Sequence, residues 1–298
     1  MRIAADQYVL DMSSKHPAVA EVASGSKVTF ETKDCFSNTI VNPDHLFSSV
    51  GWDKINPATG PLKVTGAEPG DVLKVEILDI RVAEQGVMTT APGFGALGDE
   101  MEREVTKVIK IEGDEAVFND RIRLPLAPMI GVIGTAPAGD AIPTGTPGEH
   151  GGNMDCKRIV KGSILYLPVA VSGAMLAMGD LHAIMGDGEI VVCGVEIAGE
   201  VDVRVSVLKN PVLPTPFLIE GGSLMTIASA KTLDEAAVVA TRKMHRFLRE
   251  RLKIENHEAG MLLSAVGDLR ICQIVDPLMT ARMEFPQKIA ELYSFKLD

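Results

Sequence analysis

Aromatic residues are scarce in this sequence: they make up 4% of its 298 residues, with one Trp and three Tyr. Proteins that bind a carbohydrate or another small ligand without catalysis usually display aromatic platforms, and this chain has little material for one. Hydrophobic residues nevertheless make up 46%, so we expect a folded core filled mainly by aliphatic side chains and Met.

Paired cysteines and long apolar runs are also missing. The four cysteines, Cys35, Cys156, Cys193 and Cys272, lie far apart and form no C-x-x-C motif, which argues against a zinc knuckle or a redox motif. No apolar run approaches the roughly 18 residues of a membrane span, and no apolar signal segment follows Met1. We therefore expect a cytoplasmic protein with reduced thiols.

Positive charge is in the minority, and the formal net charge is −11. A field of this sign repels nucleic acid and anionic membranes, so we expect neither as a partner. It is compatible with a small neutral or cationic ligand, although solubility alone is the simpler explanation.

Several well-known catalytic motifs are absent. The sequence contains no G-x-S-x-G nucleophile elbow, no P-loop, no H-E-x-x-H helix and no Gly-Ser-Ser-Ser run of the common Ser-Ser-Lys amidases. Gly93-Phe94-Gly95 resembles part of a dinucleotide loop, but no strand and helix are predicted around it.

The periodicity of the sequence predicts a mainly β fold. With 28 Gly and 17 Pro the chain has many turns, and alternating or apolar runs predict strands at 27–32, 72–79 (with 80–82 as an optional extension), 107–112, 115–118, 163–171, 189–195 and 200–208. Helical spacing predicts helices at 236–252 and 257–266, the first opened by a capping box of Thr232 and Glu235. Residues 127–155 are dense in Gly and Pro with few charges, and we expect them to be ordered and functional.

The polar residues between 149 and 196 form the densest cluster. Asp180 and His182 are two apart, so both project from one face of an extended segment. One His with several carboxylates is the ligand set of a divalent ion such as zinc, manganese or calcium. The alternative is that these are turn residues, which we favour for Asp187. The combination favours a site.

A second polar group surrounds Asp34, at the end of the first predicted strand. Asp34 is either a ligand or base, or the residue of an Asx-turn that closes the strand, and the sequence leaves both open. Cys35 beside it, and Cys156 beside Asp155, are poor nucleophiles, because a neighbouring negative charge raises a thiol pKa. Nearby Lys33 and Lys157 offset this in part.

Three stretches of the chain resemble the acetamidase/formamidase family. They are residues 31–36 (ETKDCF), residues 56–73 (NPATGPLKVTGAEPGDVL), and residues 148–155 (GEHGGNMD) followed by 179–182 (GDLH) and 186–189 (GDGE). The resemblance implies a β-sandwich-like N-terminal domain, residues 1–125, joined to a mixed β/α domain, residues 126–298, that carries the site. It also implies hydrolysis of short amides such as acetamide or formamide, in a homodimer or a larger homo-oligomer.

Amide hydrolysis needs a nucleophile, an oxyanion site and a proton for the departing nitrogen. Our hypothesis is a divalent metal, zinc first and calcium or manganese as alternatives, held by Asp34, Asp155 and His182 with Glu196 as a further ligand. Glu189 is the predicted general base and then acid, and Asp180 is a further catalytic residue. Asn153, or the backbone amides of Gly151 and Gly152 at the substrate, would hold the oxyanion, and His150 is a second group for proton transfer.

Three rival functions remain open. One is a metal-free amidase that uses a Glu–Cys or Glu–Lys pair. Another is a non-catalytic β-sandwich that binds a small ligand. The third is a metal-dependent hydrolase of a different amide, an ester or a cyclic imide.

Overall fold

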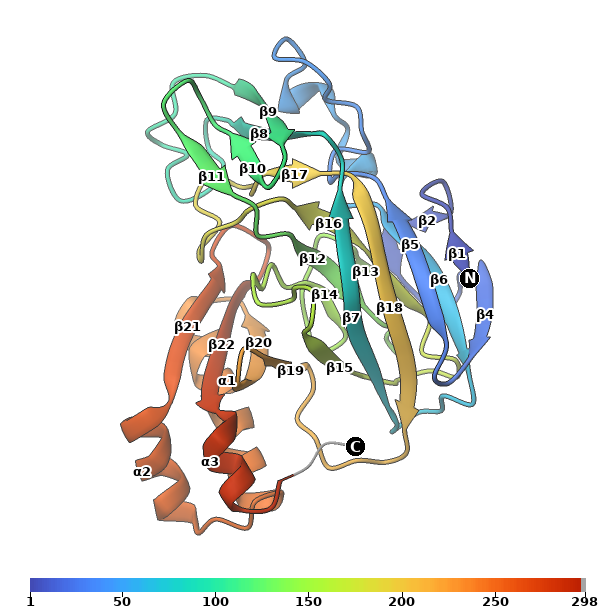
Figure 1. The fold of residues 1–298 in the computed structure, drawn as a ribbon, viewed down its shortest axis with the longest axis vertical. Coiled ribbons are helices and arrows are strands. Elements are labelled where there is room, and N and C mark those ends of the chain that lie inside the picture. Colours follow the sequence, from blue (N-terminus) through green and yellow to red (C-terminus); the bar gives the residue numbers. More distant parts are fainter. Residues whose placement is uncertain (296–298) are drawn as a thin grey trace.

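The computed structural model describes residues 1–295, and most of its regular structure is β-strand (Figure 1). Two large sheets and one two-stranded sheet account for the strands. The smallest pairs β3 (Asp11–Met12) with β13 (Ile142–Pro143). The prediction of a mainly β protein is confirmed.

The first sheet has nine strands and includes the two longest in the molecule. Its order is β1 (Arg2–Ile3), β5 (Lys27–Thr32), β18 (Gly199–Leu208), β7 (Val72–Val82), β15 (Ile164–Pro168), β19 (Phe217–Glu220), β20 (Ser223–Ala230), β22 (Met279–Pro286) and β21 (Asp268–Gln273). The long strands β7 and β18 pair antiparallel and lie side by side in Figure 1.

The second sheet has eleven strands and carries the candidate site. Its main path is β11 (Arg123–Pro125), β10 (Glu115–Val117), β9 (Val105–Glu112), β8 (Gln85–Thr90), β17 (Glu196–Ile197), β16 (Leu176–His182), β12 (Met129–Gly134) and β14 (Gly151–Asn153). Strand β6 (Ala58–Thr65) also pairs with β16, and β2 (Tyr8–Val9) and β4 (Ala20–Ala23) pair with β6. All seven residues of β16 are buried, which is expected of a strand in the middle of a sheet.

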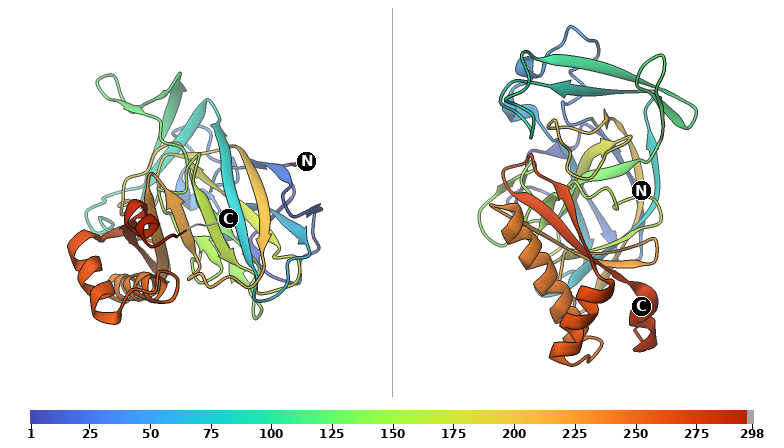
Figure 2. Two further views of the ribbon diagram at one scale, coloured as in Figure 1. Left: turned by 60° about the horizontal axis from the view of Figure 1, so that its bottom comes forward. Right: turned by 90° about the vertical axis from the view of Figure 1, so that its left-hand side faces the viewer.

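Three α-helices gather at one end of the molecule, as both views of Figure 2 show. They are α1 (Leu233–Glu250), α2 (Asn256–Val266) and α3 (Gln287–Leu292), and two short 3-10 helices, η1 (Phe47–Ser49) and η2 (Trp52–Lys54), lie in a loop near the site. Helix α1 packs on β20 and β22, where Met244 and Phe247 join a core cluster with Phe285. Thr232 and Glu235 form the predicted capping box, so this prediction is confirmed.

The main core lies between the two large sheets. It joins Phe30 of β5 and Val203 of β18, from the first sheet, to Leu62 of β6, Ile133 of β12 and Met178 of β16, from the second. Face-to-face packing of this kind buries the inward side chains of both sheets. Because the site residues of β16 lie beside this core, their backbone is held rigidly.

Most predicted strands are observed within a few residues of their expected bounds, including β5 at 27–32 and β7 at 72–82. The strand expected at 189–195 is wrong: these residues form turns, with Glu189 and Val192 at φ +51° and +89°. Residues 127–155, which we expected to be ordered, contain the strands β12, β13 and β14.

Both large sheets take strands from either side of residue 125. In the first sheet β7 lies between β18 and β15, and in the second β8 pairs with β17. A boundary at residue 125 therefore has to divide both sheets. The two domains, a β-sandwich-like domain at 1–125 and a mixed β/α domain at 126–298, stay a prediction.

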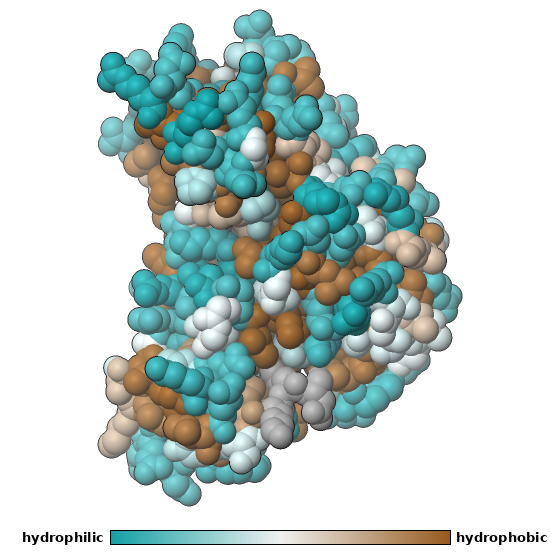
Figure 3. All heavy atoms as spheres, in the orientation of Figure 1, coloured by the Kyte–Doolittle hydropathy of each residue, from teal (hydrophilic) through white to brown (hydrophobic). Residues whose placement is uncertain are grey.

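Most of the face in Figure 3 is hydrophilic, with hydrophobic side chains visible at the lower left over the helical end. There Met261 of α2 and Leu269 of β21 are 69% and 50% exposed. Among the described residues, no helix combines the length and apolar character needed to cross a membrane.

Candidate active site

Five buried side chains converge at one end of β16, and we call them the acid cluster: Asp155, Asp180, His182, Glu189 and Glu196. The Nε2 atom of His182 lies 3.0 Å from Glu196 Oε1, 3.6 Å from Asp180 Oδ1, 3.8 Å from Glu189 Oε1 and 3.9 Å from Asp155 Oδ1. None of the five residues is more than 7% exposed. Sequence positions up to 41 residues apart therefore meet around one imidazole.

The strands explain this convergence. Asp180 and His182 lie on β16, two residues apart and on one face, and the β16–β17 register places Glu196 opposite His182. Asp155 comes just after β14, and Glu189 lies in the loop between β16 and β17. His182 Nδ1 lies 3.3 Å from Met185 Sδ, which leaves Nε2 facing the acids.

Three members of the acid cluster have a strained backbone. Asp155, Asp180 and Glu189 adopt φ values of +41°, +55° and +51°, in the left-handed region that non-glycine residues rarely occupy. Such conformations cost on the order of 1 kcal/mol or more each and collect at functional sites. The fold thus maintains an unfavourable backbone that brings these carboxylates together.

Gly131, on β12, makes room for the cluster. A Cβ at this position would lie 2.4 Å from Asp155 Oδ1 and 2.7 Å from Asp180 Oδ2. Any side chain would displace at least one carboxylate. Nothing in the sequence around Gly131 distinguished it from other strand glycines, so sequence reasoning missed it.

Burial shifts the protonation of the cluster. Burial raises the pKa of Asp155 to about 7, and the charge of Asp180 acts in the same direction. Burial also raises the pKa of Glu196 to about 8, although the neighbouring His182 lowers it. Burial and the charge of Asp155 also raise the pKa of Glu189 well above its usual range. For His182, burial lowers the pKa, but the negative charges of Glu196 and Asp180 outweigh this effect and raise the pKa above its ordinary value.

Many polar atoms of the cluster find no hydrogen-bond donor or acceptor among the described residues. They are both carboxylate oxygens of Asp155, Oδ1 of Asp180, and one oxygen each of Glu189 and Glu196. Buried acceptors are normally satisfied, so a cluster of unpaired carboxylates calls for a cation or for protons.

The donor set suits a divalent metal. Ligand atoms from Asp155, His182 and Glu189 lie within 4.8 Å of one another, as do those from Cys35, Asp180 and Glu196. Carboxylate and imidazole ligands favour ions such as zinc or manganese. The side chains present therefore fit a divalent metal ion, as the sequence predicts. Which ion binds here is considered under the proposed function.

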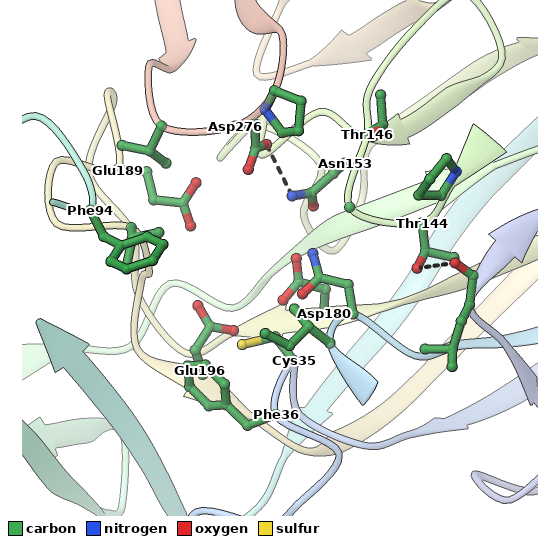
Figure 4. A pocket seen from close by; sticks show the side chains of 18 of the residues that line it. Cys35, Phe36, Phe94, Thr144, Thr146, Asn153, Asp180, Glu189, Glu196 and Asp276 are labelled. Carbon is green, nitrogen blue, oxygen red and sulfur yellow. Dashed lines mark hydrogen bonds between the residues drawn. The ribbon is translucent and has the colours of Figure 1, made fainter. Parts of the chain in front are cut away.

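A cavity of about 730 Å³ opens above the cluster and is lined by Asp180, Glu189 and Glu196. Figure 4 shows these carboxylates directed into it, with Asp276 and Asn153 on another side. Asn153 Nδ2 donates a hydrogen bond to Asp276 Oδ2 at 3.0 Å. Burial and the charge of Asp155 raise the pKa of Asp276. Sequence reasoning missed Asp276, a single acid in the turn between β21 and β22 with no polar neighbours to mark it.

Asp34 is not among the residues that line the cavity, although its neighbour Cys35 is. Asp34 Oδ1 accepts hydrogen bonds from the backbone amides of Phe36 at 3.0 Å and Asn38 at 2.6 Å, which is the geometry of the Asx-turn alternative. Burial raises the pKa of Asp34 to about 6. A role as metal ligand stays a prediction for Asp34, with one oxygen already engaged in the turn.

Cys35, next in sequence, lines the cavity beside Asp180 and Glu196. Burial, and then the charge of Glu196, raises the pKa of its thiol well above the ordinary value. Because the thiolate is the reactive form, this environment disfavours Cys35 as a nucleophile at neutral pH.

The other predicted residues lie farther from the cavity. His150, Gly151 and Gly152 are buried but are not among the residues that line it. The Gly151 amide already donates to Gly148 O at 3.1 Å. Asp187, interpreted from sequence as a turn residue, accepts two hydrogen bonds from Arg282, at 2.7 and 2.9 Å.

Comparison with protein families gives a clear match. The family described as the acetamidase/formamidase family matches residues 13–144 and 138–290. Among curated relatives, an acetamidase from Mycolicibacterium smegmatis is 30% identical over 260 residues, which cover 65% of this chain and 64% of the relative. The chain spans between 62% and 64% of the length of the curated relatives it matches.

Solved structures match over the full fold. The crystal structure of an acetamidase from Bacillus halodurans has a TM-score of 0.98 and 52% identity, covering 99% of this chain and all of that one (100%). A predicted acetamidase/formamidase from Thermoanaerobacter tengcongensis has a TM-score of 0.97 and 44% identity, covering 99% of this chain and 98% of that one.

Proposed function

The chain belongs to the acetamidase/formamidase family, and from this premise we propose that it hydrolyses short-chain amides to a carboxylic acid and ammonia. The names of its relatives support the reaction, and the site supports the chemistry. The observation that carries the proposal is the convergence of Asp180, Glu189 and Glu196 at the floor of one cavity. Glu189 and Glu196 have raised pKa values, and such acids in a cleft are typical of sites that move protons near neutral pH.

We propose that the acid cluster holds a divalent metal, zinc first, with Asp155, His182 and Glu196 among its ligands and Asp34 at the edge. A bound metal would supply an activated water at neutral pH and polarise the amide carbonyl. Support comes from the unpaired oxygens of Asp155, which otherwise lie buried without a donor. Calcium and manganese are the alternatives for the same oxygen-rich donor set.

Glu189 is our choice for proton transfer. It lines the cavity, and burial together with the charge of Asp155 raises its pKa well above the usual range, which increases its affinity for a proton. It would take a proton from the attacking water and pass it to the departing nitrogen, so that amide and water give carboxylate and ammonium. Asp180, at the same wall, would orient the water, and His150, away from the cavity lining, is the weaker second candidate for the proton.

Asn153 is our choice for the oxyanion. Its amide donates one N–H to Asp276, which fixes the side chain and leaves the second N–H for the carbonyl oxygen. Gly151 and Gly152 were predicted for the same role, but the Gly151 amide is already used. We expect Asn153→Ala to lower kcat by about 100-fold to 1,000-fold, as loss of one oxyanion donor does elsewhere.

The decisive experiment measures ammonia release from acetamide and formamide together with the metal content of the purified protein. We expect at least about one tightly bound divalent ion per chain. Removal of the ion by a chelator should abolish turnover, and addition of zinc should restore it. Full turnover by metal-free protein would remove the metal from the proposal. Absence of ammonia from every amide would overturn the function.

The rival of a metal-free Glu–Cys amidase has one observation in its favour, since Cys35 lines the cavity. The raised pKa of the Cys35 thiol argues against a Glu–Cys amidase. Among the described residues, no Lys lines the cavity, which disfavours a Glu–Lys pair. A thiol-blocking reagent that inactivates metal-free, active enzyme would favour this rival.

We also propose that the protein acts as a homo-oligomer in the cytoplasm. Strand β21 ends the order of the first sheet and exposes Leu269 and Ile271, at 50% and 40%, and α2 exposes Met261. An apolar edge of this kind is usually covered by a partner. The four free cysteines suit a reducing compartment. Light scattering during size exclusion measures the oligomer directly.

A further inference from the structure

The cavity above the acid cluster is much larger than acetamide. Its volume is about 730 Å³, within the range of pockets that hold drug-sized ligands. Acetamide has four non-hydrogen atoms and fills on the order of 100 Å³ at liquid-like packing. A site built only for acetamide or formamide would leave most of this space to water.

The spare volume has an apolar, partly aromatic wall. Phe36, Phe47 and Phe94 line it together with Ile55 and Val192. The ring centroids of Phe36 and Phe47 are 6.0 Å apart at an interplanar angle of 76°, and those of Phe47 and Phe94 are 5.2 Å apart at 72°. Edge-to-face rings of this kind present a surface on which another ring packs well.

This wall adjoins the carboxylates. Figure 4 shows Phe94 beside Glu189 and Glu196, and Phe36 next to Glu196. An amide group placed at the carboxylates would therefore direct its acyl substituent towards the rings. With 9 Phe, one Trp and three Tyr in the whole chain, three Phe around one cavity are a notable concentration.

The loop that carries Phe94 contacts the loop between β16 and β17, which carries Glu189. Gly95, at φ +72°, packs so closely on the segment after Glu189 that a Cβ would lie 2.6 Å from Ile190 O. The Ala96 amide donates to the same Ile190 oxygen at 2.8 Å. The Gly93-Phe94-Gly95 motif, which has no dinucleotide-binding context, thus holds an aromatic ring at a fixed place relative to Glu189.

We propose that the site is selective for primary amides whose acyl group carries an apolar ring, with Phe94 as a specificity-determining residue. This inference rests on the proposed amidase function and extends its substrates from short-chain amides to amides with an apolar ring. Covering a phenyl-sized group with apolar surface increases binding by roughly tenfold to a hundredfold. Phenylacetamide should therefore have a kcat/KM about tenfold or more above that of acetamide.

The experiment measures kcat/KM for phenylacetamide and acetamide with the wild-type holoenzyme and with Phe94→Ala, Phe94→Leu and Phe118→Ala. Phe94→Ala should lower the phenylacetamide-to-acetamide ratio about fivefold or more, and Phe94→Leu should retain most of it. Phe118 is half-buried outside the cavity lining, and its replacement should leave the ratio unchanged.

The outcomes separate the two proposals. Turnover of acetamide with no preference for phenylacetamide would overturn the substrate class and leave the amidase function standing, and it is the result expected if a second copy of the chain fills the cavity. A preference that persists in Phe94→Ala would remove Phe94 from the proposal. Ammonia from neither amide would overturn both. The wild-type ratio decides the substrate class even if a variant fails to fold.

Discussion

Two groups of carboxylates in this molecule have opposite surroundings. On the outer face of β7 and β18, Asp79, Glu200 and Asp202 surround Arg81, which donates hydrogen bonds to them at 2.8, 2.9 and 2.6 Å. We call these four residues the surface network. Hydrogen bonds from Arg81, and from Lys161 in the case of Asp79, lower the pKa of Asp79 and Asp202. In the acid cluster, burial raises the pKa of Asp155, Glu189 and Glu196.

The difference shows which acids serve structure and which await a ligand. Every carboxylate of the surface network has a cationic partner within the chain and stays in contact with water. The acid cluster has one imidazole, no guanidinium, and several oxygens without a donor among the described residues. A fold tolerates such a group only where function requires it, because unpaired buried charge costs several kcal/mol.

The largest expected effect comes from removing the imidazole. His182→Ala should abolish tight metal binding and lower kcat/KM for acetamide on the order of a thousandfold or more, because Nε2 is the nitrogen around which the cluster is built. Metal analysis and ammonia release measure both. The matched control is Asp202→Asn in the surface network, for which neither quantity should change. A His182→Ala protein with full metal content and turnover would contradict the site.

The next effect tests the packing of the cluster. Gly131→Ala places a methyl group against Asp155 and Asp180, which must move. Displacement of catalytic groups by about 1 Å costs on the order of a hundredfold in kcat. Gly139→Ala is the control, since a Cβ there meets nothing within 4 Å and its φ is not positive. Equal activity of the two variants would show that the carboxylates do not need their observed positions.

A third effect is on stability and depends on pH. In the unfolded chain carboxyl groups titrate near pH 4, whereas burial raises the pKa of Asp155 to about 7 and of Glu196 to about 8. Between pH 6.5 and 8.5 the folded, metal-free protein thus binds more protons than the unfolded chain. Its stability must fall as pH rises through this window. His150, whose pKa burial lowers to about 4, acts in the opposite sense, mainly between pH 4 and 6.5, where the unfolded imidazole binds a proton and the folded one does not.

With one to two protons involved, we expect a loss of about 2–4 kcal/mol between pH 6.5 and 8.5, and a fall in Tm of about 3–6 °C. Thermal unfolding in the presence of a chelator measures it. Saturating zinc should remove most of the fall, because the ion takes the place of the protons. Asp155→Asn should reduce the pH dependence and Asp202→Asn should not. A Tm independent of pH without metal would argue against buried, protonated acids.

The contrast between the two groups also explains how far the sequence could be interpreted. Half-exposed strands such as β5 alternate in burial and were predicted at their observed bounds. Strand β16 is buried on both faces and contains Gly179, so its sequence does not alternate between apolar and polar residues. The strand was therefore not predicted. Residues 189–195 are apolar enough for a strand, yet positive φ values at Glu189 and Val192 turn the chain there.

The same limit applies to the site. The Gly-Asp-Leu-His motif indicated that Asp180 and His182 lie on one face, because two residues that are two apart on a strand project from the same side. Asp276 and Gly131 belong to the site through tertiary contact alone, across 121 residues in the case of Asp276 and Asp155, and no local pattern reports that. Cys35 was noted for its neighbour Asp34, whereas its burial beside Glu196 could only be seen in the fold.

The smallest effect is expected where charges look most numerous. Arg81→Met breaks every hydrogen bond that Arg81 makes in the surface network, yet the residue is 43% exposed along its side chain, so water screens the acids that remain. We expect a loss of about 1 kcal/mol and a Tm lower by about 1–2 °C, with metal content and turnover unchanged. High salt should shrink the difference from wild type, because at 1 M it screens charges beyond about 3 Å. A salt-independent loss would mean that the methylene stem of Arg81 contributes by packing. Loss of metal or turnover would mean that the two groups of carboxylates are coupled through β18, and the distinction between structural and ligand-binding acids would then have to be abandoned.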